Sequence, residues 1–254
     1  MKRKLEGTVA LVTGASSGIG DATARRLAAE GARVALVARR RDRLDGLVAS
    51  LASDGSEAIA IEADLTDRVQ ARAAVEQAVG KWRRLDTVVN NAGLAMIGPF
   101  AEAPEAEWEH MIAVNLSAVL TVTQAALPHL VRAAQDSPRR VADVVNISST
   151  GGRVARPSMA VYSTTKFGVN AFSESLRQEL QPHRVRVGVV EPGIVQTELA
   201  SRLSSGVREA LAKQTQSVEM LLPEDVADAV AYVVTRDRRV AVNEILVRAG
   251  AQTW

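Results

Sequence analysis

A tyrosine and a lysine separated by three residues are the first candidates for chemistry. Tyr162 and Lys166 lie near the start of a segment with helical spacing, and residues four apart share one face of a helix, with Cβ atoms about 5–6 Å apart. A free phenol has a pKa of about 10, whereas a neighbouring ammonium stabilises the phenolate and lowers that pKa. A phenol tuned in this way suits an acid that protonates a developing alkoxide, or a base in the reverse direction. Because such a pair is common by chance, this interpretation needs support from other residues.

A glycine-rich stretch near the N-terminus predicts a phosphate-binding turn. It follows an apolar strand candidate and precedes a helix. Gly14 permits a tight turn, Gly18 lets backbone amides approach a pyrophosphate, and Gly20 allows close packing of the helix on the strand. The helix N-terminus supplies unpaired N–H groups and the positive end of the helix dipole. The residues expected to bind a dinucleotide here are Gly14, Ser16, Ser17, Gly18, Ile19 and Gly20.

The end of the second strand indicates which dinucleotide is bound. An NAD enzyme places an acidic residue there for the adenosine ribose, and this chain has Ala38 followed by Arg39 and Arg40. A guanidinium matches phosphate geometry with paired donors, so the two arginines predict an adenosine 2′-phosphate and hence NADP(H). The alternative is a basic turn balanced by Asp42 and Asp45, which fits an NAD-preferring alcohol dehydrogenase.

These residues need a scaffold, and the chain alternates short β-branched runs with helix-length segments. Strands are expected at 8–13, 33–38, 58–62, 87–90, 141–147, 185–191 and 244–248. Most are continuous apolar runs, as in a parallel sheet covered on both faces. Helices are expected at 22–30, 41–53, 69–82, 105–134, 158–180 and 224–234. This order predicts an α/β fold with one doubly wound (Rossmann) sheet, helices on both faces and a single domain over residues 1–254.

Two stretches depart from the alternation of strands and helices. Residues 135–140 predict a turn lengthened by polar residues. Residues 197–222 have weak periodicity and several serines, which predicts a long irregular segment just beyond a strand. Such a segment is often a functional lid, so we expect a substrate-binding lid there. A surface excursion without function is the alternative.

Composition narrows the function classes. The 254 residues are 47% hydrophobic and 24% charged, and 31 basic against 29 acidic residues give a net charge of only +2, which does not indicate a nucleic-acid partner. The lack of cysteine excludes disulfides and thiolate chemistry. His110, His129 and His183 do not have the spacing of a metal site, so none is expected. No stretch approaches the roughly 20 apolar residues of a membrane helix, and a cytoplasmic protein without a membrane partner is predicted.

Together, these motifs resemble the classical short-chain dehydrogenase/reductase family. The resemblance spans essentially the whole chain and implies a seven-stranded parallel sheet with a Ser–Tyr–Lys–Asn catalytic set. It is carried, in order and at the family's spacings, by TGASSGIG at 13–20, NNAG at 90–93, Asn115, Ser149, YSTTK at 162–166 and EPGIVQT at 191–197.

The resemblance implies a role for each catalytic residue. Tyr162 would be the general acid/base, and Ser149 would polarise the substrate oxygen, with Ser148 as the less favoured candidate. Lys166 would bind the nicotinamide ribose hydroxyls and lower the pKa of Tyr162. Asn115 would hold a water in a proton relay; its alternative is a helix-packing amide with a satisfied hydrogen bond.

Further cofactor contacts are implied along the chain. Asp64 and Leu65 resemble the family's adenine contact, and a cap for the helix after Thr66 is an equal alternative for Asp64. The residues expected to line the cofactor or to orient its nicotinamide amide are Asn91, Ala92, Gly93, Pro192, Gly193, Ile194 and Thr197.

A narrower resemblance points to one branch of the family. The segments 165–180, 191–199 and 243–248 are similar to the NADP-dependent branch holding clavulanic acid dehydrogenase and short-chain 3-hydroxy acid or serine dehydrogenases. The chain departs from that branch in the longer turn at 135–140 and in its last five residues, GAQTW. The family also implies a homo-oligomer, a tetramer or a dimer.

The predicted function is hydride transfer between NADP(H) and a secondary alcohol or ketone of a small organic substrate, with the direction left open. A catalytically silent dinucleotide-sensing regulator would typically lack the tyrosine or the lysine, and a nucleotide-sugar epimerase or dehydratase would usually be longer. Arg153 and Arg156 could meet a substrate carboxylate or lie in solvent. An apolar cleft is expected from Leu94, Met96, Ile97, Val154, Met159, Leu199, Leu203 and Met220.

Overall fold

The strands form one parallel sheet at the centre of the molecule. The structure is a computed structural model that describes residues 3–199, 205–216 and 218–253. In these residues seven strands are hydrogen-bonded in the order β3-β2-β1-β4-β5-β6-β7, and every pair is parallel. The predicted seven-stranded Rossmann sheet is therefore confirmed. The strands are β1 (Val9–Thr13), β2 (Arg33–Ala38), β3 (Ala58–Glu62), β4 (Thr87–Asn90), β5 (Ala142–Ile147), β6 (Val185–Pro192) and β7 (Glu244–Val247).

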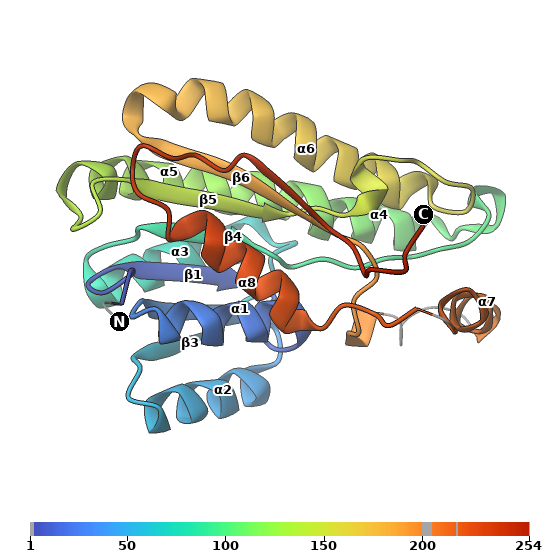
Figure 1. Cartoon of the computed structure of the whole chain (residues 1–254), viewed down its shortest axis with the longest axis horizontal. Helices are drawn as coiled ribbons and strands as arrows, with labels where there is room; N and C mark the ends of the chain where they lie inside the picture. Colours follow the sequence, from blue (N-terminus) through green and yellow to red (C-terminus); the bar gives the residue numbers. More distant parts are fainter. Residues whose placement is uncertain (1–2, 200–204, 217, 254) are drawn as a thin grey trace.

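Helices cover both faces of this sheet and give a three-layer domain (Figure 1). Helices α1, α2 and α8 pack on one face, and α3, α5 and α6 pack on the other. Because both faces are buried, β1, β4, β5 and β6 are buried along their whole lengths. The helices are α1 (Gly18–Ala29), α2 (Arg41–Ser53), α3 (Arg68–Trp82), α4 (Glu105–Ile112), α5 (Ala118–Asp136), α6 (Ala160–Leu180), α7 (Ser205–Thr215) and α8 (Pro223–Val234).

The helix expected over 105–134 is interrupted. Its spacing is helical throughout, but the backbone forms a π-helical turn at Ala113–Ser117, between α4 and α5. Helix α5 then continues to Asp136, so the expected turn at 135–140 is reduced to its last residues. Amphipathic spacing does not reveal one inserted residue, because the apolar face continues on both sides of it.

Two other features differ from the sequence-based expectation: the start of α1 and the segment 197–222. Helix α1 begins at Gly18 and not at residue 22, because the second half of the glycine-rich stretch forms its first turn. The segment 197–222 is not irregular throughout, since it contains α7, which lies apart from the three layers (Figure 1). Residues 200–204 and 217 of this segment lie outside the described residues.

One helical segment is longer and more apolar than the sequence analysis expected. Residues 105–136 have a mean hydropathy of 1.5 in their most apolar window, which is long and apolar enough to cross a membrane by length and composition. In the fold, however, α5 buries Val119, Val122, Ala126 and Leu130 and packs against α3 and the sheet. It is therefore a core helix.

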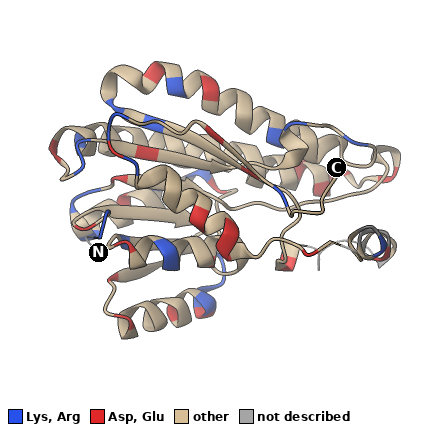
Figure 2. Ribbon diagram, viewed as in Figure 1, with Lys and Arg blue, Asp and Glu red and all other residues tan. Residues whose placement is uncertain are grey.

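Charged residues of both signs are interspersed along the helices and loops (Figure 2). Arg26 of α1 forms ion pairs with Glu30 and with Asp228 of α8, and Arg177 pairs with Glu174 on α6. These arginines thus form ion pairs with acidic residues that lie close to them in the fold.

Candidate active site

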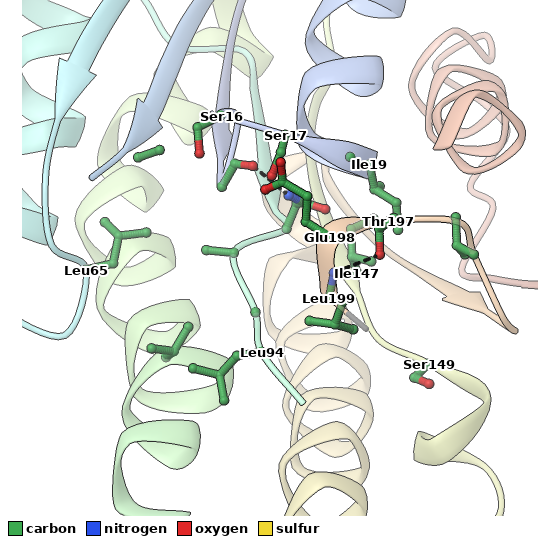
Figure 3. A pocket seen from close by; sticks show the side chains of 18 of the residues that line it. Ser16, Ser17, Ile19, Leu65, Leu94, Ile147, Ser149, Thr197, Glu198 and Leu199 are labelled. Atoms are coloured by element: carbon green, nitrogen blue, oxygen red, sulfur yellow. Dashed lines mark hydrogen bonds between the residues drawn. The ribbon is translucent and has the colours of Figure 1, made fainter. Parts of the chain in front are cut away.

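A cleft follows the carboxyl edge of the sheet, where the loops after β1 to β6 meet. The strand order reverses between β1 and β4, and such a switch point is where doubly wound sheets bind ligands. Figure 3 shows Leu65 and Ser149 far apart in this cleft, with Ser17 between them. The sequence-predicted residues that line it are Gly14, Ser16, Ser17, Gly18, Ile19, Arg39, Arg40, Asp64, Leu65, Asn91, Ala92, Gly93, Ser149, Tyr162, Lys166, Pro192, Gly193 and Thr197.

The glycine-rich turn has the shape that a diphosphate requires. Gly14 has a φ of 67°, and a Cβ there would lie 2.9 Å from the Cα of Ala92 in the loop after β4. A Cβ on Gly20 would lie 2.3 Å from the carbonyl oxygen of Gly14. Ser17 is the N-cap of α1 and makes no capping hydrogen bond with its side chain, so the first amides of the helix face the cleft without a side-chain cap. These residues fit a dinucleotide phosphate.

A small network joins the turn after β1 to the loop after β4. The Thr13 hydroxyl accepts hydrogen bonds from the amides of Asn91 at 2.9 Å and Ala92 at 3.0 Å, and the Asn91 side chain donates to the Thr13 carbonyl at 2.9 Å. Both loops are thereby held at a fixed separation along the cleft. Asn91 thus supports the glycine turn besides lining the cleft.

The two arginines after β2 lie differently. Arg39 is exposed at the cleft edge, whereas Arg40 reaches back over the glycine turn and donates to the Ser17 hydroxyl at 2.7 Å and the Ser16 hydroxyl at 3.0 Å. Neither forms an ion pair with Asp42 or Asp45 among the described residues, and Asp45 pairs with Arg41 instead. Both guanidinium groups thus lie at the end of the cleft beside the glycine turn, and that of Arg40 also pairs with Glu198.

Asp64 lines the cleft and does not cap a helix. Its carboxylate accepts hydrogen bonds from the amide and hydroxyl of Thr66, and the backbone hydrogen bond is the main cause that lowers its pKa. Helix α3 is capped by Asp67, which accepts from the amides of Val69 and Gln70. The alternative in which Asp64 caps this helix is therefore wrong.

Tyr162 lies near the start of α6 with its phenol beside Ser149. Both side chains are buried, and a hydrogen bond with Ser149 acts to lower the Tyr162 pKa. The 3₁₀ turn Thr150–Gly152 brings the two together: Ser149 accepts from the Gly151 amide at 3.0 Å, and a Cβ on Gly151 would lie 3.0 Å from the Tyr162 ring. The Ser148 hydroxyl, in contrast, lies 3.3 Å from the Lys166 carbonyl oxygen. The structure thus places Ser149 rather than Ser148 beside the phenol.

Burial dominates the protonation of the tyrosine and the lysine. It raises the pKa of Tyr162 above its ordinary value and lowers the pKa of Lys166 to about 8. The Lys166 Nζ lies 5.9 Å from the centre of the Tyr162 ring and donates to the carbonyl of Ile147 at 2.9 Å. The expectation that Lys166 lowers the Tyr162 pKa is therefore not met in this structure. Both groups are shielded from water, which penalises both charged forms.

The buried lysine predicts a measurable dependence of stability on pH. The Lys166 pKa falls from 10.5 in the unfolded chain to about 8 in the folded one, so between these values the unfolded chain binds more protons and stability rises with pH. We expect the free energy of unfolding of the wild type to rise relative to Lys166→Met by about 2 kcal/mol between about pH 7 and about pH 9.5. Urea denaturation across this range measures the difference.

The control for this measurement is Lys81→Met, which removes an exposed lysine on α3. Its stability difference from the wild type should stay constant over the same pH range. A constant difference for Lys166→Met as well would show that the Lys166 ammonium is not desolvated in the folded chain.

Asn115 lies in the π-helical turn and clamps the loop after β4. Its amide oxygen accepts from the Leu94 N–H at 2.9 Å, and its amide nitrogen donates to the Leu94 carbonyl at 2.8 Å and to the Thr165 hydroxyl at 3.2 Å. The side chain is 1% exposed and does not line the cleft. These contacts agree with the packing alternative, and the proton relay stays a prediction.

The segment after β6 is supported from behind by the C-terminal tail. The Gln252 side chain accepts from the Ile194 amide at 3.0 Å, and a Cβ on Gly193 would lie 2.1 Å from the same oxygen. Ile194 consequently does not line the cleft, and Val195 does. The role of Gln252 could not be predicted from the sequence, because its contact with Ile194 forms only where the chain turns back after β7.

Several residues of the cleft were missed by sequence reasoning. Val195 and Glu198 adjoin predicted residues of the segment after β6, and that proximity is the only signal the sequence offers for them. The residues that the structure adds to the predicted lining are Ala63, Val114, Ile147, Val195 and Glu198.

Part of the expected apolar cleft forms beside Tyr162, whereas Val154 is 49% exposed. Leu94, Met96 and Met159 pack in one cluster around its ring, together with Met111. The expectation for Leu203 lies outside the described residues.

Arg153 is bound within the protein. Its guanidinium donates to both oxygens of Glu191, which is 0% exposed, and also contacts Glu244. Asn170 donates to the same Glu191 carboxylate at 2.7 Å. The Arg153 side chain is 39% exposed and its guanidinium pairs with two carboxylates of the protein, so a contact with a substrate carboxylate stays a prediction.

Comparison with known proteins identifies the family. The family model described as short chain dehydrogenase matches residues 8–208. The chain belongs to the short-chain dehydrogenase family. Among the relatives of this dehydrogenase, an uncharacterized oxidoreductase of Methylorubrum extorquens is 39% identical, covering 97% of this chain and 98% of the relative.

Solved structures of the family share the fold of this dehydrogenase. A metagenomic short-chain oxidoreductase in complex with NADP is 34% identical, with a TM-score of 0.81 over 97% of this chain and 99% of the other. A 3-ketoacyl-(acyl-carrier-protein) reductase from Brucella melitensis, complexed with NADH, is 30% identical, with a TM-score of 0.85 over 97% and 98%. The dehydrogenase is thus an oxidoreductase of a family that binds nicotinamide dinucleotides.

Proposed function

We propose that the protein is an NADP(H)-dependent reductase of ketones, or dehydrogenase of the corresponding secondary alcohols, on small organic substrates. The observation that carries this proposal is the pairing of Tyr162 with Ser149 in the same cleft as the glycine turn and Arg40. A binding protein without turnover has no need of a buried phenol and ammonium, since both are costly to bury. Among the described residues, no contact favours the dinucleotide-sensing regulator.

The residues of the site divide the reaction between them. When bound, NADP(H) supplies or accepts the hydride. Tyr162 would donate its phenolic proton to the substrate oxygen during reduction and take it back during oxidation, while the Ser149 hydroxyl holds that oxygen in place. Lys166 would donate to the ribose hydroxyls of the nicotinamide half. The apolar side chains of Leu94, Met96 and Met159 exclude water from the substrate side.

The preference for NADP(H) is supported by charge at the adenosine end. Ala38 stands where an NAD enzyme has an acidic residue, and Arg39 and Arg40 follow it at the cleft. The NADH complex of the Brucella melitensis reductase makes an NAD-preferring enzyme the second candidate. Cofactor titration distinguishes the two.

Arg39→Asp is expected to weaken NADPH binding by on the order of tenfold or more and to tighten NADH binding, because it replaces a phosphate partner with a carboxylate that suits ribose hydroxyls. Fluorescence titration of the two cofactors measures both affinities. Arg132→Asp, an exposed position on α5, is the charge-matched control and should change neither. Equal affinities of the wild type for NADPH and NADH would contradict the NADP(H) assignment.

Finer features of the proposal follow from the family. We expect a homo-oligomer that acts in the cytoplasm, and the core position of residues 105–136 supports a soluble protein. We also propose that the protein belongs to the branch that holds clavulanic acid dehydrogenase and short-chain 3-hydroxy acid or serine dehydrogenases. The segment 197–222 is proposed as the substrate-binding lid. A panel of ketones and 3-oxo acids screened by NADPH consumption identifies the substrate.

A further inference from the structure

We propose that Glu198 competes with the adenosine 2′-phosphate for Arg40, and thereby limits the margin by which the protein prefers NADP(H) to NAD(H). The inference rests on the proposed function, because it requires that a 2′-phosphate be bound at Arg40. It adds a specificity-determining residue that lies on the segment after β6, far in sequence from the arginines after β2.

The contact that carries the proposal spans the cleft. Glu198 follows Thr197 at the end of the segment after β6, and its carboxylate lies 2.8 Å from the Nη1 of Arg40. Its other oxygen lies 3.2 Å from the Nη1 of Arg43, in the first turn of α2. One carboxylate therefore bridges two guanidinium groups at the rim where the adenosine half would enter.

The position of Arg40 makes this bridge relevant to a phosphate. Its Nη2 and Nε donate to the hydroxyls of Ser16 and Ser17, so the guanidinium is held against the glycine turn. Figure 3 shows Glu198 close to Ser17 within the cleft. Nη1 is the nitrogen of Arg40 that is not bonded to these serines, and one of its two N–H donors points to the carboxylate. A 2′-phosphate bound at Nη1 would compete with the carboxylate for that donor.

The charge of Glu198 strengthens this competition. The hydrogen bond from Arg40 is the main cause that holds the pKa of Glu198 below its ordinary value, and Arg43 adds to it. The carboxylate is therefore ionised at neutral pH and repels a dianionic phosphate. The cofactor without this phosphate, NAD(H), does not meet the same repulsion.

The solvent exposure of Arg40 and Glu198 limits how much Glu198 changes the affinity for a 2′-phosphate. The side chains of Arg40 and Glu198 are 36% and 46% exposed, so water and salt screen their attraction. We expect removal of the carboxylate to tighten binding of a 2′-phosphate by about two- to fivefold at low salt, and by less at high salt.

The experiment compares 2′,5′-ADP with 5′-AMP, which differ only in the 2′-phosphate. Calorimetric titration of the full-length wild type and of Glu198→Gln with both nucleotides, in about 20 mM and about 300 mM salt, gives all the affinities without turnover. We expect Glu198→Gln to tighten 2′,5′-ADP at low salt and to leave 5′-AMP unchanged. Equal tightening of both nucleotides, or of neither, would overturn the proposal.

Two controls isolate the contact. Glu219→Gln removes an exposed carboxylate of the same segment that pairs with no described arginine, and it should change neither affinity. In an Arg40→Gln background, Glu198→Gln should have a smaller effect, because the competition for Arg40 is gone and only the direct repulsion between the carboxylate and the phosphate remains. An undiminished effect in that background would contradict the assignment to Arg40.

The same titration separates this inference from the proposed function. If the wild type binds 2′,5′-ADP no better than 5′-AMP, the NADP(H) preference fails. If the wild type shows that preference but Glu198→Gln leaves it unchanged, only the role of Glu198 fails.

Discussion

Replacement of Tyr162 by phenylalanine is expected to lower turnover by about 10²–10⁴-fold, the usual contribution of one general acid/base, while NADPH binding stays intact. The change removes only the hydroxyl that pairs with Ser149, and phenylalanine keeps the ring that packs with Leu94 and Met111. Lys166 and the glycine turn are untouched. Steady-state kinetics with a responsive ketone and fluorescence titration with NADPH measure the two effects separately.

The chain offers a matched control for this substitution, because it has a second tyrosine. Tyr232 lies on α8, is 51% exposed and has the Arg236 guanidinium stacked 4.2 Å from its ring centre. Tyr232→Phe should leave both turnover and NADPH affinity at the wild-type values. If Tyr162→Phe retained full turnover, Tyr162 would not be the acid/base.

Gly20→Ala is expected to have the largest effect on the fold and on cofactor binding together. The new Cβ would lie 2.3 Å from the Gly14 carbonyl oxygen and 2.6 Å from the Asn91 side-chain nitrogen. Because the first contact is backbone, α1 has to move away from β1, at a cost of about 1–3 kcal/mol. That movement would also misplace the amides at the start of α1, and the loss of one charge-assisted hydrogen bond would weaken NADPH binding by about tenfold or more.

Gly46→Ala is the control for Gly20→Ala. Gly46 lies inside α2, and a Cβ there would have no neighbour within 4 Å. Alanine is the better helix former, so this variant should gain up to about 1 kcal/mol of stability and bind NADPH as the wild type does. Urea denaturation and NADPH titration of both variants test the pair. Unchanged stability of Gly20→Ala would show that the close approach at Gly20 is not required.

The local patterns of the sequence were enough to predict the scaffold. Continuous β-branched runs between helix-length segments predicted each strand within one or two residues, because burial on both faces leaves a strand no polar side. The glycine-rich turn and the Tyr162–Lys166 spacing were also readable, since each depends on residues that are close in sequence. These local features also carried the family resemblance, which the match over residues 8–208 confirms.

Only the tertiary structure decided how distant segments share the site. Val195 lines the cleft in place of the expected Ile194, because the Ile194 amide donates a hydrogen bond to the Gln252 side chain in the C-terminal tail. The tertiary structure joined Arg153 to Glu191, and Arg40 to Glu198, which lie far apart in the chain. It also reversed the expected pKa shift of Tyr162, because desolvation depends on how many neighbours enclose a group rather than on which residue is four positions away.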